Sequence, residues 1–246
     1  MKLDHVSPSR ALEENEARSL LQGQTVALAV GNPLLLAAMN LLEVFRGKIL
    51  WAVTTEKEAL QEATLQPPDL LILTDELEQG YGPSLIHELK TKAPETHTLI
   101  FLAKETAVVV EECLEAGAEG ICFNSHVSDG DGDFVKALRA IAKRGVYYPE
   151  EVKKKAGYLG VTPPALVLPS DMTEREKEVL AGLSEGLSNK ELAESLFISA
   201  ETVKSHLKSI TGKLGVRDRT AAAIFAVRAG VSRSFPKRDS PTSEGG

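Results

Sequence analysis

Cysteine is scarce in this sequence of 246 residues, and the two that occur, Cys113 and Cys122, exclude a disulfide framework. Long apolar runs are also missing, since none approaches the ~20 residues that a membrane-spanning helix needs. The charged N-terminus lacks the apolar centre of a signal peptide. We therefore expect a cytoplasmic protein with no membrane partner.

Motifs for metal binding and catalysis are missing as well. The five histidines show no metal-ligand spacing with each other or with cysteine, and there is neither a phosphate-binding Gly-Lys-Ser/Thr loop nor a nucleophile elbow. The segment "SDGDGDF" (128–134) has the alternating acids of a calcium loop, but Phe134 and Ala140 stand where such a loop needs Gly and Glu. We expect no metal, no cofactor and no enzyme.

Acidic residues outnumber basic ones over the whole chain, which gives a net charge of -7, but the balance differs between segments. From Met172 to Ile198 six acids stand against three bases, whereas from Ser199 to Arg219 five bases stand against two acids. A local basic surface of this kind can still attract an anionic polymer, because steering follows the local field.

Short apolar runs alternate with helical patterns from Thr25 onward. The expected strands are "TVALAV", "ILWAVT", "DLLILT", "TLIFLA" and "GICF", each followed by a helical stretch. This alternation predicts an α/β fold, a doubly wound five-stranded parallel sheet, and the later helical segments predict a small all-α four-helix domain.

Composition suggests five regions along the chain. The polar start is expected to be flexible, and the segment rich in Pro, Gly and Lys to be a linker with one short helix at its start. The regions are residues 1–23 (flexible), 24–150 (sheet domain), 151–170 (linker), 171–231 (helical domain) and 232–246 (flexible tail).

The helical domain contains two helices joined by a short turn. Ser199 is expected to cap the second helix, on which Val203, Leu207, Ile210 and Leu214 form one apolar stripe. The opposite side is exposed and carries Lys204, Ser205 and Lys208. Such a helix can enter the major groove, with these three side chains at base edges and Lys190, Ser199 and Thr202 at phosphates. The alternative is an ordinary four-helix domain with solvated lysines.

At this point a family resemblance is clear. The run "LSNKELAESLFISAETVKSHLKSITGKLGVRDRTAAA" resembles the LuxR/FixJ-type helix-turn-helix over some 60 residues without gaps. The resemblance implies that Lys204, Ser205 and Lys208 face bases and that Lys190, Thr202 and Arg217 contact the DNA backbone. It also implies a dimer contact through the last helix, with Ala222, Ala226 and Val227; the alternative for that helix is closure of its own domain.

The preceding region, residues 24–150, resembles a response-regulator receiver domain. Receivers transfer phosphate to an Asp at the end of the third strand, with help from an acidic pair that holds Mg²⁺, a hydroxyl and a Lys. The resemblance implies that these positions fall on Val30 and Gly31 for the acidic pair, Thr74 for the phosphoacceptor, Leu102 for the hydroxyl and Asn124 for the Lys. Asp75 lies one residue further, where a strand side chain turns to the other face. We therefore expect a pseudo-receiver.

These observations favour a sequence-specific transcriptional regulator that binds double-stranded DNA as a homodimer, at an inverted-repeat operator, without aspartyl phosphorylation. The pseudo-receiver is expected to serve dimerisation or the sensing of a regulatory protein or small ligand, and RNA polymerase is a further candidate partner. Two alternatives stay open: a protein-docking adaptor with weak DNA contact, and a regulator phosphorylated at Asp75.

Overall fold

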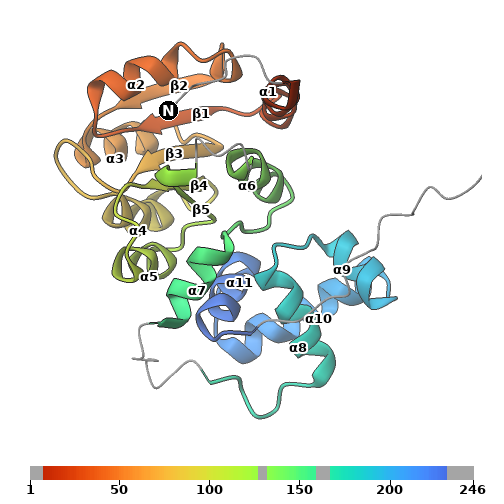
Figure 1. Cartoon of the computed structure of the whole chain (residues 1–246). Helices are drawn as coiled ribbons and strands as arrows, with labels where there is room; N and C mark the ends of the chain where they lie inside the picture. The colour runs from red at the N-terminus through yellow and green to blue at the C-terminus, as the bar shows by residue number, and fades with distance from the viewer. Residues whose placement is uncertain (1–7, 127–131, 159–166, 232–246) are drawn as a thin grey trace, which may run out of the picture.

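The computed structural model describes residues 8–126, 132–158 and 167–231. Its centre is a sheet of five parallel strands in the order β2-β1-β3-β4-β5 (Figure 1). The strands are β1 (Val26–Ala29), β2 (Ile49–Val53), β3 (Leu70–Thr74), β4 (His97–Leu102) and β5 (Gly120–Phe123). The predicted α/β class, the five strands and their parallel arrangement are confirmed.

Helices cover both faces of this sheet, because successive strand residues point to opposite sides. In β3, Leu71 and Leu73 pack into one hydrophobic cluster, and Leu70 and Ile72 into the other. The first face is covered by α3 (Glu56–Leu65), α4 (Gly82–Lys92) and α5 (Ala107–Ala116), and the second by α1 (Pro8–Leu20), α2 (Pro33–Asn40), η1 (Glu43–Phe45) and α6 (Asp133–Ala142). The short helix η2 (Asn124–His126) follows β5.

The N-terminal segment corrects one prediction. Residues 1–23 were expected to be flexible, but α1 packs on α6 and η1, and Ala17 and Leu21 are buried. Beside Ala17, the partly exposed Glu16 pairs with Arg139 of α6. A helix held partly by an ion pair is missed by a search for hydrophobic periodicity.

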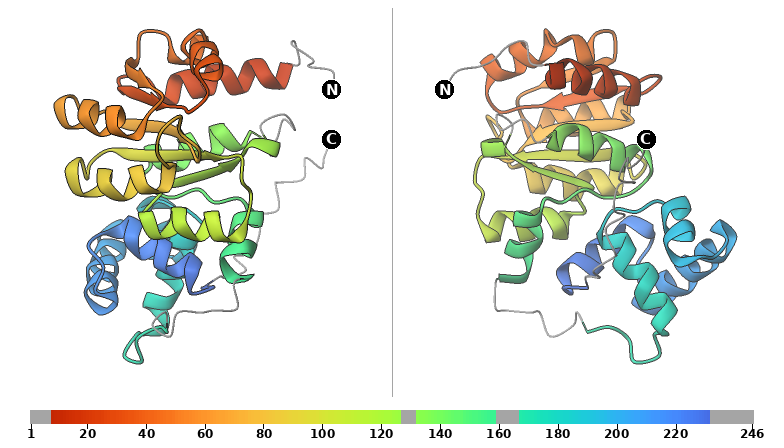
Figure 2. Two further views of the ribbon diagram at one scale, coloured as in Figure 1. Left: turned by 90° about the vertical axis from the view of Figure 1, so that its left-hand side faces the viewer. Right: turned by 45° about the vertical axis from the view of Figure 1, so that its right-hand side comes forward.

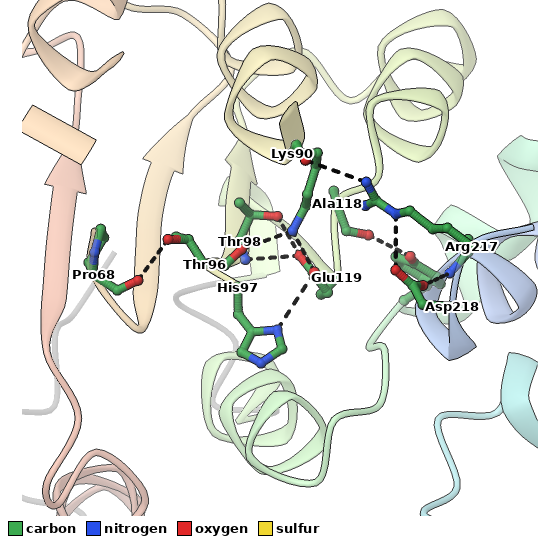
Figure 3. A network of polar contacts seen from close by, with 11 residues as sticks. Pro68, Lys90, Thr96, His97, Thr98, Ala118, Glu119, Arg217 and Asp218 are labelled. Carbon is green, nitrogen blue, oxygen red and sulfur yellow. Dashed lines mark hydrogen bonds and ion pairs between the residues drawn. The ribbon is translucent and has the colours of Figure 1, made fainter. Parts of the chain in front are cut away.

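A buried polar network ties α4 to the starts of β4 and β5 (Figure 3). The Lys90 ammonium lies 2.5 Å from Glu119 Oε1, and Thr98 donates to Oε2 through its N–H and its hydroxyl. Burial would raise the pKa of Glu119, but His97, Lys90 and Thr98 outweigh it and hold that pKa below its usual value. The carboxyl of Glu119 therefore stays charged, and its ion pair with Lys90 ties α4 to the amino ends of β4 and β5.

The second domain is helical and consists of α8 (Glu174–Ser184), α9 (Asn189–Leu196), α10 (Ala200–Leu214) and α11 (Arg219–Arg228). The helix α7 (Glu150–Tyr158) stands between the domains, at the start of the segment expected to be a linker. Its Val152 is fully buried in the cluster that runs from the sheet to α8–α11. The expected tail, residues 232–246, and most of the "SDGDGDF" loop lie outside the described residues.

Candidate nucleic-acid interface

Two capped helices, α9 and α10, form the helix-turn-helix geometry (Figure 1). Ser188 caps α9 in a capping box with Glu191, and Phe197 ends it in a left-handed conformation with φ of 53°. Ser199 then caps α10 by accepting a hydrogen bond from the Thr202 N–H. Each capping side chain thus satisfies a free backbone donor and defines the residue at which its helix begins.

The apolar face of α10 lies against the domain core. Val203 and Ile210 are fully buried, and Leu207 and Leu214 are partly buried against the same cluster. The opposite face carries Lys204, Ser205 and Lys208, all exposed. Lys204 makes an ion pair with Glu201 at 3.1 Å, between two side chains that are both mostly in solvent. Such a surface pair is weak and can be exchanged for a phosphate or a base edge.

The expected phosphate contacts divide into two groups. Lys190, Ser199 and Thr202 are exposed at the N-terminal ends of α9 and α10, on elements joined by the turn. Arg217 is turned elsewhere: its Nε lies 2.9 Å from Asp218, and its Nη1 donates to the main-chain oxygen of Lys90 at 3.5 Å (Figure 3). In this structure Arg217 therefore faces the sheet domain.

Glu176 of α8 forms a capping box with Thr173 and also contacts α10. Its carboxylate accepts hydrogen bonds from Ser209 at 2.6 Å and Lys213 at 2.8 Å, both on α10. The hydrogen bonds from Lys213 and Ser209 lower the pKa of this buried carboxyl to about 2. It thus positions the candidate recognition helix. No pattern in the sequence pairs residues that stand 33 and 37 positions apart.

The last helix, α11, faces the interior of the chain in this arrangement. Ala222 and Ala226 are fully buried and Val227 nearly so, in the core that α11 shares with α8 and α7. Small side chains allow close approach of helices, and here they allow α11 to pack within its own chain. The three residues therefore form no free surface in this arrangement, and a dimer contact through them stays a prediction that needs α11 to be released.

Contacts across the domain boundary hold α11 in place. The Arg228 guanidinium pairs with Glu111 at 2.6 Å and Glu115 at 2.8 Å, both on α5. Lys143 pairs with Glu191 at 2.6 Å, and Arg219 donates to the main-chain oxygen of Arg144 at 3.0 Å. The two domains are thus clamped by polar contacts around an apolar centre, with α7 and α11 between the sheet domain and the remaining helices (Figures 1 and 2).

The strand-end positions that a receiver uses for phosphate are occupied by other contacts. Thr74 donates to Glu76 O at 2.8 Å and accepts from the Gly31 N–H at 3.2 Å. A side chain at Gly31 would meet Glu76 O at 2.4 Å, so the loops after β1 and β3 touch through their backbones. Val30 and Leu102 are buried and apolar.

Asp75 is fully buried beside this site. Its Oδ1 accepts from the Ala103 N–H at 3.1 Å and its Oδ2 from the Lys104 N–H at 2.8 Å. The exposed Glu76 pairs with Lys104, and Asn124 lies exposed at the start of η2. Within the described residues, no group of three or more His, Cys, Asp or Glu side chains is arranged to hold a metal ion.

Comparisons with known proteins identify the family of the two domains. The family described as "Bacterial regulatory proteins, luxR family" matches residues 170–226. The transcriptional regulatory protein LnrK of Bacillus subtilis is 34% identical over 187 residues, covering 72% of this chain and 83% of LnrK. The DNA-binding transcriptional activator DevR/DosR of Mycobacterium tuberculosis is 29% identical over 186 residues, covering 75% and 83%.

A solved structure is also similar. RcsB from Salmonella enterica serovar Typhimurium, bound to a promoter, is 21% identical with a TM-score of 0.49, covering 83% of this chain and 98% of that one. No helix in the described part of the chain is long and apolar enough to cross a bilayer. From the match to LnrK and the LuxR-type domain, the chain belongs to the LuxR-type response regulators, in which a receiver-like domain precedes a helix-turn-helix DNA-binding domain.

Proposed function

We propose that this protein is a sequence-specific, non-enzymatic transcriptional regulator of the cytoplasm whose α10 reads double-stranded DNA in the major groove. The observation that carries the proposal is the exposed row of Lys204, Ser205 and Lys208, on a helix whose opposite face is locked in the core. Lys190, Ser199 and Thr202 supply phosphate contacts beside it. Two such modules on one homodimer read an inverted repeat, and RNA polymerase is a further candidate partner.

A mobility shift with genomic fragments tests this proposal. Lys204→Ala combined with Lys208→Ala abolishes the shift, because both cations and their counterion release are lost. The control, Lys57→Ala with Lys92→Ala, removes two exposed lysines of the sheet domain and leaves the shift unchanged. A wild-type chain that shifts no fragment supports the adaptor alternative. If both double variants shift the DNA as the wild type does, another surface of the protein binds the DNA.

We further infer that regulation does not use aspartyl phosphorylation. Buried Asp75 already holds two backbone N–H groups, Thr74 is bonded to the Gly31 and Glu76 backbones, and the position of the acidic pair has no side-chain oxygen. Mg²⁺ and a phosphoryl group need several negative and positive partners at one place. These contacts support a pseudo-receiver that serves pairing or sensing.

Intact-mass measurement after incubation with acetyl phosphate and Mg²⁺ tests this inference. The expected result is no gain of mass. A gain of about 80 Da that Asp75→Ala removes would establish the phosphorylated alternative. A receiver with a complete acidic site, treated in the same tube, is the positive control.

One cavity in the receiver-like domain is a candidate site at which the pseudo-receiver could bind a small ligand. It measures about 310 Å³ and lies between the end of α1, α6 and the starts of β3 and β4, lined by Leu21, Asp69, His97, Leu138 and Arg144 among others. It is at the opposite edge of the sheet from Thr74. Its lining mixes leucines with the charged or polar side chains of Asp69, His97 and Arg144, so a ligand for it would be small and largely polar.

A further inference from the structure

The cavity at the amino ends of β3 and β4 is lined by charges of both signs. Asp69 and Glu95, just before these two strands, line one wall, and Arg144, just after α6, lines another. Asp69 accepts hydrogen bonds only from the N–H and hydroxyl of Thr25, which are uncharged. Within the described residues, neither the Glu95 carboxylate nor the Arg144 guanidinium makes an ion pair. These three charges are therefore available to a ligand.

The backbone of Arg144 adopts a conformation that is unfavourable for an arginine. Its φ is 56°, and Phe197 is the only other non-glycine residue with a positive φ in the described part of the chain. Glycine adopts this conformation more readily, so local stability alone does not explain an arginine here. Residues kept in such conformations cluster at functional sites, and the unpaired guanidinium of Arg144 lies at the cavity.

The charges around the cavity determine which class of ligand fits it. The helices α1 and α6 both end here, since their last residues, Leu20 and Ala142, line the cavity. The C-terminal end of a helix carries a partial negative charge, which adds to the carboxylates of Asp69 and Glu95 and favours an ammonium group. Arg144 favours a carboxylate on the ligand. A simple anion meets two acids and a simple cation meets Arg144, whereas a zwitterion complements both walls.

We propose that this cavity binds a small α-amino acid, with the ammonium group beside Asp69 and Glu95 and the carboxylate on Arg144. The side chain of the ligand packs against Leu20 and Leu138, which also line the cavity. This proposal deepens, and rests on, the sensing role proposed above for the pseudo-receiver. The volume of about 310 Å³ is at the lower end of small-molecule pockets, which restricts the ligand to a single amino acid or one of similar size.

The cavity borders the contacts that hold the helical domain in place. Lys143 pairs with Glu191 of α9 at 2.6 Å, and the neighbouring Arg144 accepts a hydrogen bond from Arg219 of α11 through its main-chain oxygen. A ligand bound to the Arg144 side chain orders this turn and thereby strengthens the contact between the domains. By linkage, the closed arrangement binds the ligand more tightly than an open one.

A second side of the cavity leads to Arg217 (Figure 3). His97 lines the cavity, and its Nδ1 lies 3.6 Å from Glu119, the ion-pair partner of Lys90. The main-chain oxygen of Lys90 accepts a hydrogen bond from Arg217, which is an expected contact to the DNA backbone. A ligand that stabilises the closed arrangement therefore keeps Arg217 on the sheet domain, and we expect it to weaken DNA binding.

Isothermal titration calorimetry of the full chain without DNA tests the site with four probes: L-alanine, L-serine, L-valine and L-leucine. At least one binds with a dissociation constant of about 1 mM or lower. The tightest probe is then compared with the acid that lacks its amino group and the amine that lacks its carboxylate. Each binds at least tenfold more weakly, because each leaves one charged wall without a partner. No binding of any probe at about 10 mM, or equal binding of a single-charge analogue, would overturn the proposal.

Three single variants locate the binding. Arg144→Gln and Glu95→Gln each remove one charge and weaken binding at least tenfold, and Ala142→Phe fills the cavity and abolishes it. All three side chains are exposed, so circular dichroism is unchanged. The matched controls, Arg46→Gln and Glu43→Gln, remove the charges of an exposed pair outside the cavity and bind the probe as the wild type does. Cavity variants that bind as tightly as these controls would place the ligand elsewhere and contradict the proposal.

Hydrogen–deuterium exchange tests the coupling to the helical domain. The saturating probe slows exchange of the α11 amides in the wild type and weakens the mobility shift, and Arg144→Gln loses both effects. Binding that changes neither exchange nor the shift would overturn the coupling. The two proposals fail separately: a chain that shifts no DNA even without a probe contradicts the proposed function, whereas a failed titration of a chain that shifts DNA contradicts only this site.

Discussion

Asp75 shows how one position along a strand changes the chemistry of a carboxylate. Thr74 ends β3 where a receiver places its phosphoacceptor, and Asp75 follows with its side chain buried. Both of its oxygens accept backbone N–H groups, from Ala103 and Lys104 at the end of β4. The carboxylate thereby joins two loops at the carboxyl edge of the sheet, which is a structural role.

Asp75→Ala is therefore expected to destabilise the protein by about 2–4 kcal/mol, because two backbone donors lose a charged acceptor inside the protein. Urea unfolding at neutral pH measures the loss. The control Glu95→Ala removes an exposed carboxylate and stays within about 0.5 kcal/mol of the wild type. If Asp75→Ala unfolds no more easily than the control, the carboxylate is free for another role.

Sequence reasoning reached only part of this residue-scale picture. The period of two along β3 predicts that Asp75 turns away from the phosphoacceptor face. The two N–H groups that donate to its carboxylate belong to residues 28 and 29 positions later. They are backbone groups, which leave no signature in the sequence. The same limit applies to Glu176, whose cap with Thr173 is visible locally while its bonds to Ser209 and Lys213 are not.

At the scale of elements, Glu176 joins α8 to α10 and gives the helical domain a pH dependence. Hydrogen bonds from Lys213 and Ser209 lower its pKa from the ordinary 4.5 to about 2. A carboxyl whose pKa is lower in the folded state stabilises that state above the unfolded pKa. This contribution is fully present above about pH 4.5 and is lost as the pH falls towards 2.

Glu176→Gln is expected to lower the free energy of unfolding at pH 7 by about 1–3 kcal/mol and to flatten its fall between pH 4.5 and 2. Urea titrations at pH 7, 4 and 3 compare it with Glu174→Gln, an 86%-exposed neighbour in the same helical turn. A variant whose unfolding keeps the steep acid dependence of the wild type would show that other carboxyls carry it.

Elements were predictable where periodicity is strong and local capping is clear. The five strands follow from short apolar runs, and α10 follows from its apolar stripe and the Ser199 cap. One helical stretch was expected after the first strand, but α2 ends at Asn40 and the short helix η1 follows. Leu34 and Leu41 made that run look like core, and exposure is a tertiary property that a helical pattern does not contain.

At the scale of the whole molecule, the ion pairs that hold the two domains together join residues more than a hundred positions apart. Arg228 reaches Glu111 and Glu115, and α11 packs on α5 and α7. The same small residues that suit a dimer helix suit this intramolecular packing, so the sequence could not decide between them. One atom weakens the clamp: Glu111 Oε2 is buried and has no hydrogen-bond partner among the described residues. Such an atom costs free energy and offsets part of what the ion pairs of Arg228 contribute.

Arg228→Ala is therefore expected to open the two domains. Removing one partner of a largely desolvated ion pair costs about 2 kcal/mol, which shifts the closed-to-open ratio about thirtyfold. Both Arg228 and Glu111 are only 17% exposed, so this loss is not screened as at a surface pair. Small-angle X-ray scattering at low concentration then gives a larger radius of gyration, and the amides of α11 exchange faster with deuterium.

The matched control is Arg46→Ala, which breaks an exposed pair with Glu43 on the far side of the receiver-like domain. It changes neither the scattering nor the exchange, since a surface pair contributes little. High salt acts on the wild type in the same direction as Arg228→Ala but more weakly, because ions screen a partly buried pair only in part. If Arg228→Ala leaves the scattering and the exchange of α11 as they are in the wild type, apolar packing alone holds the domains together.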